Sequence, residues 1–449
     1  MALKFGTDGV RAVAGSALTP EFAMKLGQAA GAALVPEAGG KILIGKDTRI
    51  SSDMLEAALA AGLCSVGVDV ILLGVIATPA VAHLMKRYGA CAGIMVSASH
   101  NPFEHNGIKI FGSDGAKLSD AEQDRLTKLV EDGNFPEMRV SGEKVGRVFT
   151  ASAAIEDYVD HLCEVAGCAL SGIKVVFDGA NGSASRTIER LALRLGLDAT
   201  YLHITPDGVN INEHCGSTHP ERLCEAVLAR QADLGVAFDG DADRVIVVDE
   251  KGNVQDGDKL LAIFAGYMAE RGSLKGGAIV GTNMSNMGLS AYCKEHGLGY
   301  VTTAVGDRHV MAAMEQGGYN LGGEQSGHLI LRDHSPTGDG QLAAVYLLKI
   351  LHEKRLPLSV LASAMEPFPQ VGIAVKVKEP TKESFETAPQ YQSAIGKIKE
   401  ELGDEGRVVV RKSGTEPVIR VMVEGRDSEQ VERLASGIAA LLTELDLEI

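Results

Sequence analysis

The sequence predicts an α/β protein with three similar mixed-sheet α/β domains and a smaller C-terminal α+β domain. Apolar, β-rich runs alternate with helical patterns along most of the 449 residues, as in sheets that are covered by helices. A unit of apolar strand, polar loop and second strand recurs three times. The segment EPFPQ, residues 366–370, contains two prolines and separates a last, smaller stretch of strands and helix.

The N-terminal part of the chain shows the alternation clearly. KILIGKD, residues 41–47, is expected to form a strand, and the next helix is expected to be capped by Ser51, Ser52 and Asp53. The sequences VDVILLG, AVAHLMKRYG and AGIMVS then predict a strand, a helix and a strand. This order indicates a mixed or largely parallel sheet.

Each copy of the repeated unit joins its two strands through a polar loop. The loops are SASHNPFEHNG, DGDADR and GGEQSGH, and they share no sequence. If the copies are structural repeats, the three loops lie in equivalent positions on three domains. Polar breaks near residues 143–151, at the DEKGN turn and at EPFPQ predict the domain boundaries. The predicted domains are residues 1–150, 151–252, 253–368 and 369–449.

Composition excludes several classes of protein. The net charge is −16 and no basic stripe is present, which argues against nucleic-acid binding. The N-terminus lacks the apolar region of a signal peptide, and Asp69 and several glycines interrupt the apolar stretch 57–85. The seven cysteines include no C-x-x-C spacing, so free thiols are expected. We therefore expect a cytoplasmic protein with neither nucleic acid nor membrane as a partner.

The first loop contains Ser99, between a buried strand and the turn Asn101-Pro102. Small residues in this loop would let the backbone come close to a substrate. A loop serine on its own more often satisfies local backbone groups. No G-x-S-x-G sequence is present, which gives a hydrolase nucleophile little support.

The second loop places Asp239, Asp241 and Asp243 at alternate positions, which project to one side of an extended chain. At roughly 5 Å and an effective dielectric of about 20, each pair of carboxylates repels by about 3 kcal/mol. A hard cation such as Mg²⁺ or Ca²⁺ would offset this cost, whereas a solvated acidic turn with splayed side chains is the alternative. An EF-hand would need glycine where Arg244 stands. A phosphatase with an aspartyl nucleophile would usually have Thr or Val in place of Asp243.

Two further loops carry groups that suit sugars and phosphates. In GGEQSGH, residues 322–328, exposed backbone and the Glu, Ser and His side chains suit sugar hydroxyls, and a plain glycine turn is the alternative. RKSGTEP, residues 411–417, offers guanidinium, hydroxyl and backbone N–H donors to a phosphate, and an exposed basic hairpin is the alternative. No G-x-x-x-x-G-K-[ST] sequence indicates a nucleotide P-loop.

Together these loops make the chain resemble the α-D-phosphohexomutase family over essentially its whole length. Six sequences follow the family's order and spacing: FGTDGVR, GKDTRISS, SASHNP, DGDADR, GGEQSGH and RKSGTEP. Within the family, NINEHCGSTHPE, AVGDR and Gln325 are most similar to the bacterial phosphoglucosamine mutases. One departure is Ala12, where this subgroup typically has glycine.

The resemblance implies a role for each loop. Ser99 would be a phosphoserine, and Mg²⁺ would be held by Ser99, Asp239, Asp241 and Asp243. The residues implied around the reacting phosphoryl group are Arg11, His100, Lys109 and Arg244. Those implied to bind the sugar or the phosphate that does not react are Glu324, Ser326, His328, Arg308, Arg411, Ser413, Gly414, Thr415 and Arg420.

The activity implied is the interconversion of glucosamine 6-phosphate and glucosamine 1-phosphate, which feeds UDP-N-acetylglucosamine synthesis. Phospho-Ser99 would give its phosphoryl group to this small phosphosugar partner. The bisphosphate would turn over in a central cleft between four domains and return its other phosphoryl group. Glucosamine 1,6-bisphosphate or glucose 1,6-bisphosphate would be the activator, and the resemblance implies a homodimer. Lys109 or His100 could serve as the base, and the sequence does not decide between them.

Two further expectations follow from the sequence, and other activities remain as alternatives. Basic residues there, Arg49 among them, stand out against the net charge of −16 and predict a local anion funnel. The prolines of EPFPQ predict that the last domain can swing as a lid. Alternative activities are phosphoglucomutase or phosphomannomutase, a phosphosugar hydrolase that uses the D-x-D loop, and a non-catalytic phosphosugar sensor.

Overall fold

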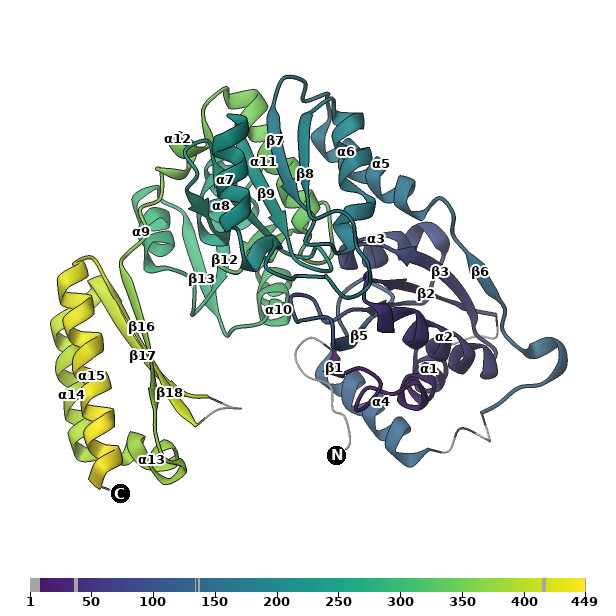
Figure 1. The fold of residues 1–449 in the computed structure, drawn as a ribbon, viewed down its shortest axis with the longest axis horizontal. Coiled ribbons are helices and arrows are strands. Elements are labelled where there is room, and N and C mark those ends of the chain that lie inside the picture. Colours follow the sequence, from purple (N-terminus) through teal and green to yellow (C-terminus); the bar gives the residue numbers. More distant parts are fainter. Residues whose placement is uncertain (1–8, 36–38, 134, 136–137, 414–416, 449) are drawn as a thin grey trace. The chain divides into compact units, whose positions relative to one another are not determined.

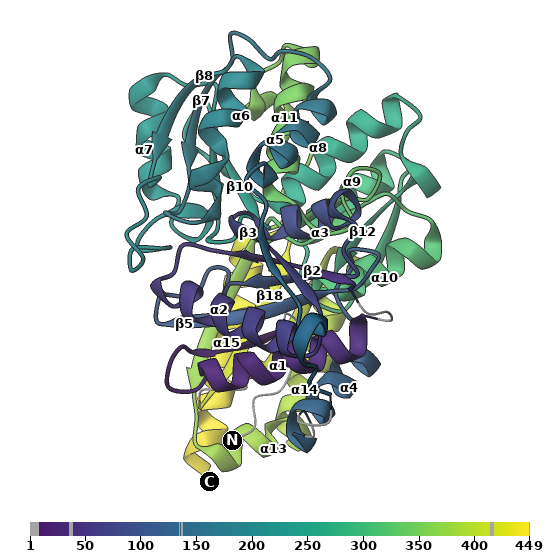
Figure 2. The same ribbon diagram turned by 90° about the vertical axis from the view of Figure 1, so that its right-hand side faces the viewer.

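The structure, a computed structural model, describes residues 9–35, 39–133, 135, 138–413 and 417–448. The chain folds into two compact units. The larger unit comprises Met1–Ser285 and Gly297–Ala364, and the smaller comprises Asn286–His296 and Met365–Ile449. Within the described residues, the larger unit contains three sheets and the smaller unit contains one (Figures 1 and 2).

The first sheet has the strand order β1-β5-β4-β2-β3-β6. Strands β4, β2, β3 and β6 run parallel, β5 is antiparallel to β4, and β1 is antiparallel to β5. The strands are β1 (Val10–Val13), β2 (Lys41–Lys46), β3 (Asp69–Val75), β4 (Ala92–Val96), β5 (His105–Phe111) and β6 (Val148–Thr150). The helices of this region are α1 (Pro20–Leu34), α2 (Ile50–Ser65), α3 (Thr78–Tyr88) and α4 (Asp120–Asp132).

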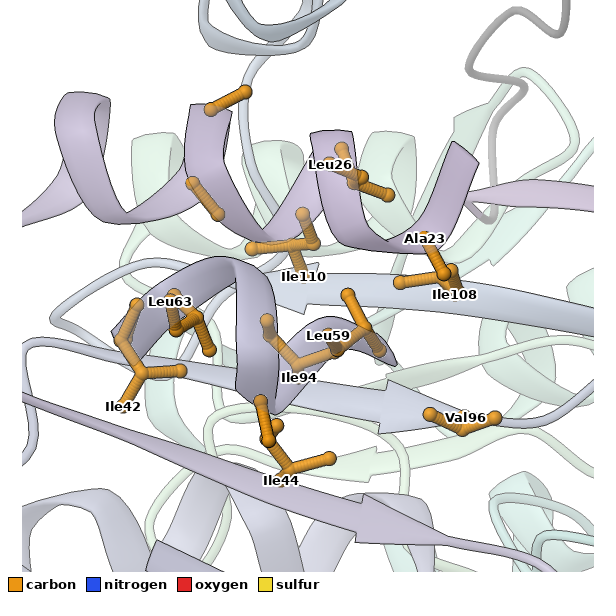
Figure 3. Close-up of a cluster of buried hydrophobic side chains, with 14 of the residues drawn as sticks. Ala23, Leu26, Ile42, Ile44, Leu59, Leu63, Ile94, Val96, Ile108 and Ile110 are labelled. Atoms are coloured by element: carbon orange, nitrogen blue, oxygen red, sulfur yellow. The ribbon is translucent and has the colours of Figure 1, made fainter. Parts of the chain in front are cut away.

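Strand β2 is buried on both faces, which explains its unbroken apolar run. Leu26 of α1 and Leu59 of α2 belong to one cluster with Ile44 of β2 and Ile94 of β4 (Figure 3). The neighbouring Gly45 faces α3, because a Cβ at this position would meet Val81 Cγ2 at 2.6 Å. Helices therefore cover both faces of the sheet, as the sequence predicts.

The start of α2 differs from the prediction. The helix begins at Ile50, with Arg49 in the N-cap position and no side-chain hydrogen bond to the cap. The Ser52 hydroxyl donates instead to Asp47 Oδ1 at 2.9 Å. The prediction that Ser51, Ser52 and Asp53 cap the helix is therefore wrong. The Ser52 side chain bonds Asp47 in the loop before the helix and not a backbone amide at the start of the helix.

The second and third sheets repeat the topology of the first. Their orders β8-β7-β9-β10 and β13-β12-β14-β15 match β3-β2-β4-β5, with three parallel strands and an antiparallel fourth. In every copy the polar loop joins the third strand to the antiparallel one, so the predicted threefold repeat is confirmed. The strands are β7 (Lys174–Asp178), β8 (Asp198–Leu202), β9 (Leu234–Phe238), β10 (Val245–Asp249), β11 (Val254–Gln255), β12 (Ala278–Thr282), β13 (Gly299–Thr303), β14 (Leu321–Gly323) and β15 (Leu329–Leu331).

The second and third domains also contain helices. They are α5 (Ala154–Ala166), α6 (Ile188–Leu195), α7 (Glu221–Arg230), α8 (Gly257–Glu270), α10 (Asp307–Gly317), α11 (Gly340–Lys354) and α12 (Leu358–Ala362). Helix α11 begins against the DGDADR loop, where the Gly340 amide donates to the Ala242 carbonyl at 3.1 Å. A Cβ at Gly340 would meet the Arg244 carbonyl oxygen at 2.4 Å, so this contact requires glycine. Among the described residues, no helix combines the length and apolar character needed to cross a membrane.

The smaller unit is an antiparallel sheet of order β16-β18-β17 with two long helices on it (Figure 1). The smaller unit also contains α9, although α9 lies between β12 and β13 in the sequence. The Met287 amide donates to Glu424 Oε1 at 2.8 Å. The Asn286 side chain donates to the Phe368 carbonyl and accepts from the Phe368 amide. Phe368, in the middle of EPFPQ, is therefore bonded within the smaller unit, and the boundary between the units in this part of the chain lies between Ala364 and Met365. The elements are α9 (Met287–Glu295), β16 (Gln370–Lys376), α13 (Glu379–Ser384), α14 (Pro389–Leu402), β17 (Gly406–Lys412), β18 (Val418–Gly425) and α15 (Ser428–Glu448).

Three histidines meet where α3, α5 and the loop after β15 come together, and they predict a pH-dependent stability. The rings of His83 and His161 stack with centroids 3.7 Å apart. Burial, then the proximity of His83 and His334, lowers the pKa of His161 to about 4. Burial is also the main cause that lowers the pKa of His83 and of His334.

Because the unfolded chain binds these protons more readily, the free energy of unfolding should be highest above about pH 6.5 and should fall toward pH 4. Urea titrations at several pH values in this range give the free energy of unfolding at each pH. Between pH 4 and pH 6.5 this free energy should change less steeply with pH for His161→Gln than for the wild type. His352→Gln, which changes an exposed histidine, should keep the wild-type slope. Equal slopes for all three proteins would exclude this histidine group as the cause.

Candidate active site

Ser99 follows β4 and is buried, with 1% of its surface exposed. Its backbone is in the left-handed region, at φ 53°, and its amide donates to Ser97 Oγ at 2.9 Å. The Ser99 hydroxyl donates to Asp239 Oδ2 at 2.5 Å. The first and second polar loops, 140 residues apart in the sequence, therefore meet at this hydroxyl.

The close approach of the two loops depends on Gly240. A Cβ at this position would meet the Ser99 carbonyl oxygen at 2.5 Å and Asn212 Nδ2 at 2.9 Å. Any larger residue would push the serine away from the carboxylates. Ala242 completes the turn in the left-handed region at φ 58°, which directs the side chains on either side of it inward.

Three buried carboxylates form the centre of the site. Oxygens of Asp239, Asp241 and Asp243 lie within 4.8 Å of one another. Burial, then the charges of Asp243 and Asp241, raises the pKa of Asp239 well above its ordinary value. Burial also acts to raise the pKa of Asp243, but Lys109 and His328 outweigh it and hold that pKa well below the ordinary value.

The carboxylates fit a hard cation. Asp241 Oδ1 and Asp243 Oδ1 are buried and accept no hydrogen bond from the described residues. Oxygen ligands of this kind suit Mg²⁺, which would satisfy both atoms and remove the repulsion between the three charges. The Ser99 hydroxyl is close enough to the group for its oxygen to join the ligand set.

Two donors from the first domain contact Asp241. Lys109 Nζ, on β5, donates to Asp241 Oδ2 at 2.7 Å and to Asp243 Oδ2 at 3.2 Å. Thr78, the first residue of α3, donates its hydroxyl to Asp241 Oδ2 at 2.5 Å and its amide to the Asp241 carbonyl at 2.9 Å. Thr78 was not predicted from the sequence, because a Thr-Pro pair indicates only the start of a helix.

His100 and Arg244 lie beside the serine. His100 Nδ1 is 3.4 Å from Ser99 Oγ and accepts a hydrogen bond from Arg244 Nη1 at 3.3 Å. Burial, followed by the charges of Arg244 and Arg11, lowers the pKa of His100 to about 4. The site therefore combines a neutral imidazole with the cationic groups of Arg11, Arg244 and Lys109.

The third loop contributes His328 to the same centre. His328 is buried, with Nδ1 3.8 Å from Asp243 Oδ2 and Nε2 3.5 Å from Asp307 Oδ2. Burial acts to lower its pKa, but Asp243 and Asp307 outweigh it and the pKa of His328 is raised. The structure thus places His328 against the carboxylate loop, and its contact with Asp307 was not predicted from the sequence.

The other residues of the third domain lie in different surroundings. Glu324 is half-buried, and its Oε1 accepts the Gly306 amide at 3.0 Å. Ser326 is exposed. Arg308 forms an ion pair with Asp120 of the first domain, so its guanidinium would have to leave that carboxylate in order to bind a phosphate.

Arg49 is not part of an anion funnel, and this prediction is wrong. Its side chain is buried, with 2% exposed, and its Nε pairs with Asp47 Oδ2 at 2.8 Å. Its remaining nitrogens donate to backbone carbonyls of the Ser99 loop. The guanidinium is therefore used to hold the loop and does not face a ligand.

The fourth loop belongs to the smaller unit. Arg411 on β17 and Arg420 on β18 are directly opposite in the strand register, and both are exposed. Like charges at such positions repel, and an anion bound between them would reverse the sign of this interaction. The Ser413 amide donates to the Val418 carbonyl at 3.0 Å. Gly414 and Thr415 lie outside the described residues.

Comparison with known proteins finds one family along the whole chain. The alpha/beta/alpha domains I, II and III of phosphoglucomutase/phosphomannomutase match residues 2–137, 156–252 and 256–368. The phosphoglucomutase/phosphomannomutase C-terminal domain matches residues 373–441.

Individual proteins are similar over nearly their full length. The phosphoglucosamine mutase of Moorella thermoacetica is 49% identical over 438 residues, which are 97% of this chain and 98% of that protein. The crystal structure of a phosphoglucomutase/phosphomannomutase family protein from Burkholderia thailandensis has a TM-score of 0.81 at 25% identity, covering 98% of this chain and 97% of that one. Aspergillus fumigatus N-acetylphosphoglucosamine mutase in complex with GlcNAc-6P and magnesium shares the fold at a TM-score of 0.67 and 18% identity, covering 99% and 96%. The chain belongs to the phosphoglucomutase/phosphomannomutase family.

Proposed function

We propose that this chain interconverts glucosamine 6-phosphate and glucosamine 1-phosphate through a phosphoserine at Ser99. The observation that carries the proposal is the hydrogen bond from Ser99 Oγ to Asp239 inside a buried group of three carboxylates. The preference for glucosamine is supported by the 49% identical relative, whose name states this activity. The product would feed UDP-N-acetylglucosamine synthesis.

The reaction consists of two phosphoryl transfers. In the first, the P–O bond to Ser99 breaks while a P–O bond forms to the O1 hydroxyl of glucosamine 6-phosphate, whose proton passes to a base. The 1,6-bisphosphate then reorients, its 6-phosphoryl group returns to Ser99, and O6 regains a proton. His100 is neutral and 3.4 Å from Ser99 Oγ, while Lys109 is paired with two carboxylates, so both stay candidates for the base.

Positive charge around the phosphoryl group is the main requirement of such a transfer. Bound Mg²⁺, held by the three aspartates and an oxygen on Ser99, would supply part of it. Arg11, Lys109 and Arg244 would supply the rest from this chain's own residues. Lys109 and Arg244 also offset part of the negative charge of the buried carboxylates when no phosphate is bound.

The remaining roles follow from the loops. Glu324 and Ser326, with His328 nearby, would bind sugar hydroxyls. The phosphate that does not react would be held by Arg308, Arg411, Ser413, Gly414, Thr415 and Arg420. A bisphosphate of glucosamine or glucose would first charge Ser99. We also propose a cytoplasmic homodimer with four domains, at residues 1–150, 151–252, 253–368 and 369–449.

A comparison of three substrates tests the preference. With Mg²⁺ and glucose 1,6-bisphosphate present, kcat/KM measured by ³¹P NMR or a coupled assay should be highest for glucosamine 6-phosphate and lower for glucose and mannose 6-phosphates. A preference for either of the last two would make the chain a phosphoglucomutase or phosphomannomutase. Steady release of inorganic phosphate without isomerisation would indicate a hydrolase instead.

A further inference from the structure

The main chain on either side of His100 is held by two side chains from different domains. The Ser99 carbonyl accepts hydrogen bonds from Arg49 Nη2 and from Asn212 Nδ2, both at 2.9 Å. The Asn101 carbonyl accepts from the same two side chains, at 2.8 Å and 3.1 Å. Ser99 is in the left-handed conformation, which is unfavourable for residues other than glycine. The four hydrogen bonds therefore stabilise a backbone conformation that the serine loop would not adopt without them.

Arg49 holds the loop from within its own domain. Beyond the two shared carbonyls, its guanidinium donates to the carbonyls of Pro102 and His105. Together with the pair to Asp47, this uses both terminal nitrogens and Nε. Arg49 is therefore so deeply involved in the fold of the loop that replacing it would disturb more than the position of Ser99.

Asn212 reaches the loop from the second domain, and its own position is fixed. It lies in the segment between β8 and α7, with its amide bonded to the Ala180 carbonyl at 2.9 Å. Asp178, at the end of β7, anchors this segment: its carboxylate accepts the Gly216 amide at 3.1 Å and pairs with His203 Nδ1 at 2.9 Å. Only 9% of Asn212 is exposed.

The residues around Asp178 that anchor this segment are also of types that bind metal ions. Ligand atoms of Asp178, His203 and Cys215 lie within 4.8 Å of one another. However, Asp178 Oδ1 already accepts the Ala180 amide at 2.9 Å, and Oδ2 already accepts from the Gly216 amide and faces the imidazole. Its oxygens are thus occupied by the protein itself, and the group is better explained as the support of the Asn212 segment.

We infer that Asn212 is a positioning residue for the phosphoserine, acting through the carbonyl oxygens of Ser99 and Asn101. The inference rests on the proposed function. The side-chain amide of Asn212 donates to the backbone carbonyls of Ser99 and Asn101 and is not bonded to Ser99 Oγ. It ties the serine loop to the domain that carries the carboxylates, and so fixes the direction in which Ser99 Oγ faces Asp239. Since misplacing a reacting group by about 1 Å can cost about 10²-fold in rate, this tie should matter for kcat.

The test compares two side chains that cross the same domain boundary. Asn212→Ala removes the bonds to the serine loop, whereas Thr48→Val removes the bond from Thr48 Oγ1 to the Asn181 carbonyl, 2.6 Å long, which does not reach that loop. We expect Asn212→Ala to lower kcat by about 10- to 100-fold while KM for glucosamine 6-phosphate changes less than about twofold. Thr48→Val should lower the melting temperature about as much as Asn212→Ala does, but it should keep kcat within about twofold of the wild type.

Single-turnover transfer makes the result specific to the serine. The enzyme is charged with glucose 1,6-bisphosphate, phosphorylation of Ser99 is verified by intact mass, and its transfer to glucosamine 6-phosphate is timed. The Asn212→Ala rate should fall as far as kcat does, and Asn212→Asp, which places a carboxylate against two carbonyls, should be at least as slow. The inference is overturned if Asn212→Ala transfers at the wild-type rate, or if Thr48→Val slows transfer equally. Failure of the wild type to transfer would contradict the proposed function instead.

Discussion

Replacing Ser99 with alanine is expected to lower mutase activity by at least about 10⁴-fold. The loss should be this large because the proposed chemistry passes through an oxygen on this side chain, and the remaining binding groups cannot replace a missing nucleophile. The Ser99 hydroxyl is also the group that touches Asp239, so its removal takes away the link between the two loops. The isomerisation of glucosamine 6-phosphate, followed with an excess of bisphosphate, measures the effect.

Two measurements separate this loss from misfolding. Ser99→Ala should keep a cooperative thermal transition, and intact mass should show that it takes up no phosphate from glucose 1,6-bisphosphate. Ser141→Ala, which changes an exposed serine of the same domain, should match the wild type in both activity and phosphorylation. Activity of Ser99→Ala within tenfold of the wild type would refute the phosphoserine mechanism.

Replacing Asp239 with asparagine should have opposite effects on activity and stability. Burial, then the charges of Asp243 and Asp241, raises the pKa of Asp239 well above its ordinary value, so an ionised carboxylate at this position is destabilised in the metal-free protein. A neutral amide of the same shape removes part of this cost, so the melting temperature of the metal-free protein should rise by about 2–4 °C. Activity in Mg²⁺ should fall by about 10³-fold, because the cation supplies several kcal/mol of charge stabilisation and loses a ligand.

A buried aspartate outside the group provides the control. Asp249 accepts hydrogen bonds from the amides of Lys251 and Asn253 in a turn of the same domain. Asp249→Asn should therefore lower the melting temperature and leave the Mg²⁺ requirement unchanged. Wild-type activity that survives EDTA, or an Asp239→Asn protein that is less stable without metal than the wild type, would contradict the assignment of the carboxylates to a cation.

Much of the fold could be predicted because its signals are local. The run KILIGK is apolar at every position that packs, and β2 is indeed buried on both faces. The polar loops stand out because each interrupts an apolar hairpin at the same place in three domains. The alternate aspartates of the second loop do converge, but not because the chain is extended as predicted: the loop forms a turn, in which the Ala242 amide donates to the Asp239 carbonyl at 3.1 Å and Ala242 is in the left-handed region.

What the sequence could not predict are contacts that depend on how the domains pack. Asn212 and Ser99 are 113 residues apart, and their bond uses a backbone carbonyl, which has no signature in the sequence. The same holds for Thr78, whose hydroxyl contacts Asp241 only because α3 begins against the second domain. Arg49 was misassigned since a basic residue in a loop can serve equally to bind an anion or to hold carbonyls.

The membership of α9 in the smaller unit was also beyond sequence reasoning. The helix lies between two parallel strands of the third sheet, where a crossover helix is expected to cover that sheet. Its start is instead bonded to Glu424 and Phe368, far along the chain. No local pattern in residues 286–296 indicates this partner.

The most direct test of the central claim follows the phosphoryl group itself. Enzyme carrying ³²P on Ser99 is mixed with unlabelled glucosamine 6-phosphate in Mg²⁺, and the products are separated after a single turnover. We predict that the label leaves the protein at a rate compatible with kcat and appears in glucosamine bisphosphate and monophosphates. Label that stays on the protein during turnover, or that appears only as inorganic phosphate, would contradict transfer through Ser99.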